Sequence, residues 1–187
     1  EAWTWEHMAL TRARVVSGPA ALREKVERAI AAVLEKPRDR ARIATDVRDM
    51  RQRIFKEKGT QDVWELKQVR GGLVDLEFIA QHLQLVHASA HPDVLSQNTL
   101  EAFRNLARLG LIDAAHAEVL IPAAQLLNDL TQVLRLCVDG PFDPATAPDG
   151  LKALLARSAG APDFDRLAAE LAAQEREVAA LFDQLVT

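Results

Sequence analysis

The sequence has no tyrosine, a single cysteine and few aromatic residues, which make up 5% of its 187 residues. One cysteine cannot build a disulfide framework, and Cys137 stands in an apolar run, where we expect a small core residue. No apolar run approaches the roughly 20 residues that a membrane-spanning helix needs, and no charged-then-apolar signal segment opens the chain. The sequence therefore predicts a cytoplasmic protein with no membrane partner.

Residues that favour β-strands are also scarce. The chain holds 15 Val and 6 Ile, against 32 Ala and 26 Leu. Ala and Leu lead the helix propensity scale, whereas β-branched and aromatic residues favour strands. This balance predicts an all-α fold and argues against a sandwich, a barrel or a parallel α/β sheet.

Apolar periodicity and stop signals divide the chain into about eight helices. Pro122 is expected to kink or end the sixth of them, and Val63–Lys67 alternates as a short extended stretch would. With no internal repeat and no long linker, we expect a single helical bundle over residues 1–187. Since the first residue is Glu1 rather than Met, we also expect a piece of a longer polypeptide. The expected helices are 2–16, 19–36, 39–58, 73–90, 98–109, 113–138, 151–158 and 163–186.

Charge is unevenly placed along the chain. The net charge is -4, but residues 1–72 carry 16 Lys+Arg against 11 Asp+Glu, whereas residues 73–187 carry 7 against 16. Such a split concerns which face meets which partner rather than the fold. It predicts a basic first part and an acidic second part with different neighbours.

Familiar catalytic signatures are missing from the sequence. It contains no Gly-Lys-Ser/Thr phosphate loop, no paired cysteines and no His-Glu-x-x-His. His87 and His91 are four apart but have no acidic or cysteine partner nearby in sequence, so surface or capping histidines are favoured over a metal site. Asp75 and Glu77 would lie about 200° apart on a regular helix and would not chelate one ion. Carboxylates in a first turn also suit the positive end of a helix.

The helix expected at 39–58 is rich in basic residues. Residues 36–58 hold nine Lys+Arg, interleaved with four acids and a single aromatic residue, Phe55. We favour a solvated, salt-bridged face, with contact to nucleotide phosphates held by a neighbouring domain as the alternative. The interleaved acids argue against nucleic acid as a partner. Trp3 and Trp5 are costly to expose and are expected to pack on the core or on a neighbouring domain.

Three runs of residues resemble one family. They are Glu-Ala-Trp-Thr-Trp-Glu-His-Met-Ala-Leu-Thr-Arg-Ala-Arg-Val-Val at 1–16, Asp-Val-Arg-Asp-Met-Arg at 46–51 and Gly-Gly-Leu-Val-Asp-Leu-Glu-Phe-Ile-Ala-Gln at 71–81. The runs are similar to those of the bacterial glutamine synthetase adenylyltransferases, also called glutamate–ammonia-ligase adenylyltransferase/adenylyl-removing enzymes. Val74-Asp75 stands where the adenylyl-removing half of that family typically has Arg-Glu. The chain therefore resembles the C-terminal helical domain of the adenylylating half.

The resemblance implies a reaction for the parent enzyme. AMP would pass from ATP to a tyrosine of glutamine synthetase with Mg²⁺, under the control of glutamine and the PII signal protein. The family's metal-binding aspartates belong to a nucleotidyltransferase domain that would precede Glu1. The resemblance thus implies that this chain, taken alone, is inactive and binds no cofactor.

The resemblance also suggests where this chain contributes to the parent enzyme. A helical domain beside the nucleotidyltransferase fold can close the nucleotide cleft from the other side. The related PII uridylyltransferases carry a similar Gly-Gly-Leu-x-Asp-Ile pattern after their nucleotidyltransferase domain. Asp75 is expected to orient a basic group. The candidate contacts to the nucleotide cleft or the neighbouring domain are Lys67, Arg70, Gly71, Gly72, Asp75, Arg12 and Arg14.

Two alternatives stay open at this point. In the first, Gly71-Gly72 serves only as a turn that leads the chain into a buried helix. In the second, which is independent of the first, the chain as a whole is a regulatory module that docks the PII signal protein or glutamine synthetase through its acidic residues 73–187.

Overall fold

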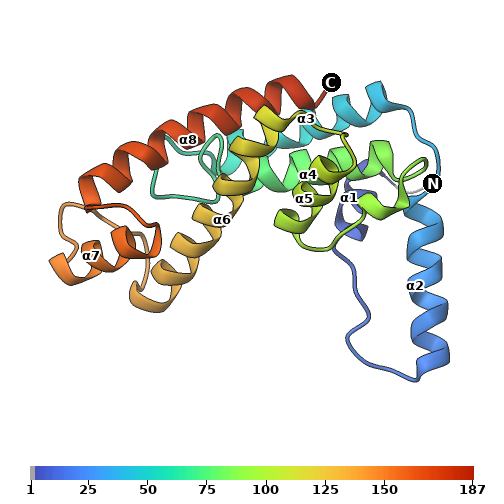
Figure 1. Ribbon diagram of the computed structural model, residues 1–187, viewed down its shortest axis with the longest axis horizontal. Coiled ribbons are helices and arrows are strands. Elements are labelled where there is room, and N and C mark those ends of the chain that lie inside the picture. Colours follow the sequence, from blue (N-terminus) through green and yellow to red (C-terminus); the bar gives the residue numbers. More distant parts are fainter. Residues whose placement is uncertain (1–2) are drawn as a thin grey trace.

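The computed structural model describes residues 3–187, and helices make up the regular structure of that range (Figure 1). The all-α fold predicted from the Ala and Leu content is confirmed. Within the same range, no helix is both long enough and apolar enough to cross a bilayer. The helices are α1 Thr4–Leu10, α2 Ala20–Leu34, α3 Arg40–Lys58, α4 Leu73–His87, α5 Thr99–Arg108, α6 Ala114–Cys137, α7 Asp149–Ser158 and α8 Phe164–Leu185, with a 3-10 turn η1 at Pro92–Val94.

Helix α4 lies at the centre of the molecule and contacts α1, α3, α5, α6 and α8. A helix that is apolar on nearly every side must be covered on nearly every side. Leu76, Ile79, Leu83 and Leu85 are accordingly buried, although they do not share one face. The central position expected from this apolar pattern is confirmed.

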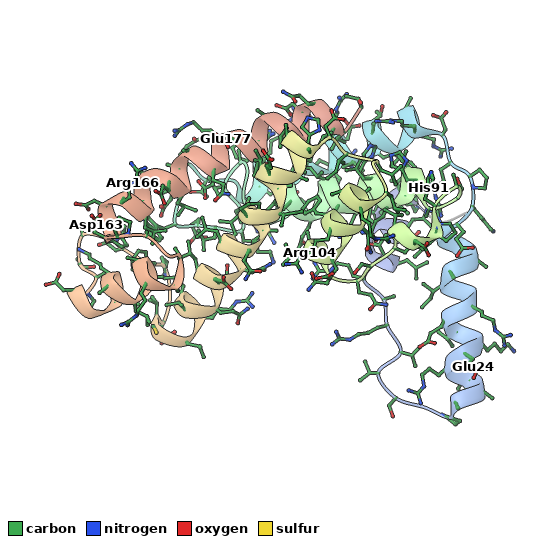
Figure 2. All side chains as sticks on the ribbon, viewed as in Figure 1. Glu24, His91, Arg104, Asp163, Arg166 and Glu177 are labelled. Carbon is green, nitrogen blue, oxygen red and sulfur yellow. The ribbon has the colours of Figure 1, made fainter. Side chains whose placement is uncertain are left out.

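Helices α6, α7 and α8 pack against one another on the side away from α2 (Figure 1). The side chain of Asp163 caps α8 by accepting a hydrogen bond from the Arg166 N–H at 2.7 Å, as its place before the apolar stripe suggests. Pro122 lies inside α6 without ending it. Arg166 and Glu177 lie along the exposed side of α8 (Figure 2).

An aromatic cluster joins the α3–α4 connection to the second half of the chain. Trp64 stacks on Phe164 with ring centroids 5.0 Å apart and meets the edge of Phe142 at 4.9 Å. The extended stretch expected at Val63–Lys67 is wrong, because this segment forms turns. The carboxylate of Asp62 accepts a hydrogen bond from the Trp64 N–H at 2.9 Å, so aspartate turn chemistry outweighs the alternating pattern.

The first helix is much shorter than the expected 2–16. It ends at Leu10, and the chain continues without helical structure to the turn before Pro19. Val15 and Val16 are β-branched and lie directly before Ser-Gly-Pro, which favours an extended backbone over another helical turn. Cys137 is exposed as the last residue of α6, so the core position expected for it is also wrong.

Residues 12–34 form an arm that projects from the bundle. The extended segment after α1 leads away from the bundle, and α2, which projects from the other helices, brings the chain back to it (Figure 1). Most side chains of α2 reach into open space, with Glu24 among them (Figure 2). The base of the arm is fixed, because Leu34 is buried and the Arg38 guanidinium donates to the Leu34 carbonyl at 2.9 Å and the Val33 carbonyl at 2.7 Å.

Candidate functional site

A fully buried carboxylate, that of Asp75, stands in the first turn of α4. It accepts hydrogen bonds from Arg51 Nε, from Arg70 Nε at 3.1 Å and from the Gly71 N–H at 2.5 Å. A buried charge is tolerated only when it is paired and hydrogen-bonded, and two guanidinium groups with one backbone donor meet this need. Asp75 therefore binds two guanidinium groups inside the protein.

Arg51 brings α3 into this cluster. Its side chain is buried, and its Nη2 donates to the Val69 carbonyl at 3.1 Å and the Gln68 carbonyl at 3.3 Å. The guanidinium also lies 5.6 Å from the centre of the Phe55 ring. One arginine thus links α3 to the segment that leads into α4.

Other parts of the backbone approach closely at the two glycines before α4. Gly71 has φ +81, and a Cβ there would lie 1.7 Å from the Glu175 carbonyl oxygen of α8. A Cβ on Gly72 would lie 2.4 Å from the Leu66 carbonyl oxygen. A side chain at either position would push helix and loop apart, so both residues must be glycine for this packing.

Arg70 connects the cluster to the last helix of the described chain. Its Nη2 lies 3.3 Å from Asp183 Oδ1, and its guanidinium lies 5.4 Å from the centre of the Phe182 ring. On the same helix, Glu175 is buried and its Oε1 has no hydrogen-bond partner among the described residues. Burial, with a smaller contribution from the charge of Asp62, raises the pKa of Glu175 to about 8.

Arg12 and Arg14 face a different part of α4. They line a cavity of about 330 Å³ together with Glu77 and residues at the start of α5. Arg12 Nη1 lies 2.6 Å from Glu77 Oε1. Asp75 and Glu77 therefore serve opposite sides of α4, as their spacing predicts.

The start of α5 adds polar groups to this cavity. Asn98 and Thr99 line it, and the Asn98 side chain caps the helix by accepting a hydrogen bond from the Glu101 N–H at 3.1 Å. Asn128 of α6 lies on another wall. Two arginines near the positive end of a helix favour an anionic group on a neighbouring molecule or domain.

The sequence-predicted site residues fall into three places. Arg70, Gly71 and Asp75 contact one another, and Gly72 begins α4 beside them. Arg12 and Arg14 share the cavity at Glu77. Lys67 is exposed and lines a separate cavity of about 230 Å³, where Arg135 and Phe142 also lie.

Histidines do not gather into a metal site in the described part of the chain. No group of three His, Cys, Asp or Glu side chains with ligand geometry lies within residues 3–187. His82 is buried in α4, and neither ring nitrogen has a hydrogen-bond partner there. Burial, with help from the positive charge of Arg40, lowers the pKa of His82 to about 4, so its imidazole is neutral at physiological pH.

Arg51 is the member of the cluster that the sequence prediction missed. It was counted among the basic residues of a solvated face, yet it is 1% exposed. Its burial could have been predicted from its position on the helix. Arg51 follows Ile43 by eight residues and Val47 by four, and it therefore shares their buried face. Glu175 carries a similar signal, because it stands four residues after Leu171 in the stripe of α8 that faces the core.

Comparison with known proteins shows two kinds of similarity. The family model described as GlnD PII-uridylyltransferase matches residues 40–186. Over 186 residues the chain is 54% identical to a bifunctional glutamine synthetase adenylyltransferase/adenylyl-removing enzyme of Rhodopseudomonas palustris. Identity to proteins of the same name is 51% in Bradyrhizobium diazoefficiens and 49% in Xanthobacter autotrophicus. Each match covers 100% of this chain and 19% of the relative, so the chain spans about a fifth of the length of these relatives.

Proposed function

Because this chain belongs to the GlnD PII-uridylyltransferase family, we propose that it is the helical domain of a protein adenylyltransferase and follows a nucleotidyltransferase domain in the same polypeptide. The observation that carries the proposal is its 54% identity, over its whole length, to a glutamine synthetase adenylyltransferase/adenylyl-removing enzyme. That name covers attachment and removal of the adenylyl group. The Gly-Gly-Leu-Val-Asp-Leu-Glu-Phe run at 71–78 favours the attaching half.

The proposed reaction moves AMP from ATP to a tyrosine hydroxyl of glutamine synthetase. The tyrosine oxygen bonds to the α-phosphorus, the bond to the β-phosphate bridging oxygen breaks, pyrophosphate leaves and the hydroxyl proton is lost. Bound Mg²⁺ would neutralise the phosphates. Residues 3–187 hold no group of three His, Cys, Asp or Glu side chains that could bind a metal ion, and the Asp75 carboxylate is bound by two arginines. We therefore assign the metal to the preceding domain. We expect this chain alone to be inactive.

Arg12 and Arg14 are the proposed contribution of this domain to the nucleotide cleft. Both line the cavity at Glu77, and Arg14 is exposed. Negative charge develops on the leaving pyrophosphate, and positioned guanidinium groups stabilise that charge more strongly in the transition state than in the ground state. Glu77 holds Arg12 in place through its ion pair at 2.6 Å.

The Asp75 cluster has a supporting role in this proposal. It fixes the first turn of α4, and Glu77, which binds Arg12, follows directly after that turn. Arg70, Gly71, Gly72 and Asp75 then act as positioning residues. Lys67, which lies apart from them, is proposed as a contact to the neighbouring domain.

The proposal is tested in the full-length polypeptide with Arg14→Gln, and with Arg104→Gln as the matched control. Arg104 is an exposed arginine of α5 (Figure 2) that pairs with Glu101 outside the cavity. We expect Arg14→Gln to lower kcat/KM for ATP at least tenfold without lowering the unfolding midpoint. The control should stay within twofold of the unaltered enzyme. A rate for Arg14→Gln within twofold would contradict the proposed cleft contact.

The alternative function is a regulatory module that binds PII or glutamine synthetase through residues 73–187. Immobilised PII and glutamine synthetase, each tested with the 187-residue chain, separate the two functions. Retention of the chain by either protein, combined with normal kinetics of Arg14→Gln, would favour the regulatory module.

A further inference from the structure

The segment between α1 and α2 has the burial pattern of a β-strand. From Arg12 to Val16 the side chains alternate between exposed and half-buried at every residue. Ala13 and Val15 are half-buried, and with Arg14 they line a cavity of about 310 Å³ whose other wall includes Ile30 of α2. Arg12, Arg14 and Val16 are exposed, and Val16 is 83% exposed. A period of two is the signature of an extended strand with one covered face.

The backbone of this segment lacks the partners that a strand needs. Within the described residues, no backbone hydrogen bond involves the N–H groups of 14–18 or the carbonyl groups of 11–18. The described range 3–187 also contains no β-strand with which it could pair. Backbone donors and acceptors in an extended segment form an edge that another strand can use. A strand that pairs with this segment would therefore come from outside this range.

Helix α2 exposes an apolar stripe beside this segment. Leu22 is 55% exposed and Val26 is 39% exposed. With Lys25 at its edge, the stripe lines an open groove of about 420 Å³, whose apolar walls are Leu10, Leu22, Val26, Ala29, Ile30 and Val33. An isolated helix of 15 residues without a side-chain cap is marginal in water, so a packed partner would also stabilise α2.

Exposed apolar side chains are concentrated in this part of the molecule. Of the six large apolar side chains that are exposed in residues 3–187, five precede residue 27. They are Trp3, Trp5, Val16, Leu22 and Val26, and the sixth is Leu136. Scattered single residues need no explanation, whereas a concentration of this kind marks an interaction surface.

We infer that the arm, residues 12–34, docks on another domain of the same polypeptide, where Arg12–Val16 adds a strand to the edge of a sheet and the α2 stripe covers apolar surface beside that edge. The inference rests on the proposed function, in which the domain that receives the arm is the nucleotidyltransferase domain. The relatives are about five times longer than this chain, so most of such a polypeptide lies outside it. A tethered domain meets the arm at a high effective concentration, which favours it over a separate protein.

The arm is suited to such docking because its base is already ordered. Arg38 and Leu34 hold the end of α2, and Thr11 Oγ1 donates to the Met8 carbonyl at 2.7 Å at the start of the extended segment. Both ends of the arm are therefore anchored to the bundle. A binding element that is ordered beforehand loses less conformational entropy on docking.

Hydrogen–deuterium exchange of the full-length polypeptide tests the inference. The amides of 14–16 should exchange at least a hundredfold more slowly than those of an unstructured peptide of the same sequence. Leu22→Glu or Val26→Glu should raise their exchange at least tenfold. Arg28→Glu, on the opposite side of α2 and with a larger change in charge, should leave it within twofold. Exchange of 14–16 at the unstructured rate would overturn the inference.

A second measurement identifies the occupant. If the protection of 14–16 disappears on dilution together with a fall in molar mass by light scattering, a second copy is the occupant and the inference is overturned. Protection that persists in the monomer supports it. Adenylylation of glutamine synthetase is measured in the same samples. An active polypeptide with unprotected amides contradicts only the docking, whereas an inactive one with protected amides contradicts only the proposed function.

Discussion

The carboxylate of Asp75 accepts a hydrogen bond from the backbone N–H of Gly71, four residues earlier, at 2.5 Å. The same two residues join three distant parts of the chain. Asp75 also binds Arg51 of α3, and Gly71 lets the backbone of α8 approach at Glu175. A short turn before the central helix is thus the point where α3 and α8 are held to α4.

Removing the Asp75 carboxylate should destabilise the protein strongly. Asp75→Ala leaves two arginine side chains without their anion, one of them buried, and breaking a buried ion pair costs about 3–5 kcal/mol. Urea unfolding followed by circular dichroism measures the loss. The control is Glu101→Ala, which removes an exposed pair with Arg104 and should cost below about 1 kcal/mol. Equal losses in the two variants would show that the Asp75 cluster contributes little.

A methyl group at Gly71 should separate α8 from the turn. In Gly71→Ala the new Cβ would meet the Glu175 carbonyl oxygen, and the positive φ adds strain. Together they should cost about 3 kcal/mol or more. Gly110→Ala is the matched control, since Gly110 also has a positive φ but no atom within 4 Å of its Cβ position. We expect about 1–2 kcal/mol for the control, from strain alone. The midpoints of thermal unfolding of the two variants measure this difference.

The buried carboxyl of Glu175 should make stability fall as pH rises. The unfolded chain releases this proton near the ordinary pKa of 4.5, whereas the folded protein holds it to about 8. The contribution of Glu175 is therefore fully present below pH 4.5 and is lost as pH rises through 8. Glu175→Gln should gain stability relative to the unaltered protein across this window. Glu177→Gln, an exposed neighbour on α8, should show no such trend in the pH dependence of the unfolding midpoint.

The buried imidazole of His82 should make stability fall as pH falls, the opposite of the effect of Glu175. Its pKa is about 4 in the folded protein and 6.5 when exposed, so the unfolded chain takes up the proton first as pH falls. The contribution of His82 is present above pH 6.5 and is lost as pH falls through 4. His82→Leu should resist acid unfolding in this window, whereas His91→Leu, at an exposed position, should not. The measurement is an acid titration followed by circular dichroism. Unfolding of both variants at the same pH as the unaltered protein would contradict the prediction.

Local sequence patterns predicted much of the fold. The bounds of α2 to α8 lie within three residues of those expected, because apolar period, caps and proline stops act over a few residues. The segment after Leu10 was expected to be helical because a helix tolerates most residues of Thr11–Val16. It is extended instead, as the β-branched residues at its end favour. Its alternation is visible in burial only after the position of α2 is known.

Long-range contacts explain what the sequence did not predict at the candidate site. Gly71-Gly72 was recognised as a turn, but nothing near it in sequence indicates that Glu175, about a hundred residues later, approaches its backbone. Arg51 was assigned to solvent because its neighbours are charged, although its helical phase pointed to the core. The separation of Arg12 and Arg14 from Asp75 likewise depends on which side of α4 each one meets.

The three tryptophans divide between two optical environments. Trp64 is enclosed by Phe142 and Phe164, whereas Trp3 and Trp5 stack on each other with centroids 4.8 Å apart and remain exposed. Since the sequence contains no tyrosine, intrinsic fluorescence comes from these indoles with no tyrosine emission beneath it. An aqueous quencher such as iodide reaches the stacked pair and not Trp64. The protein thus carries one spectroscopic reporter for its core and another at the start of α1, beside the arm.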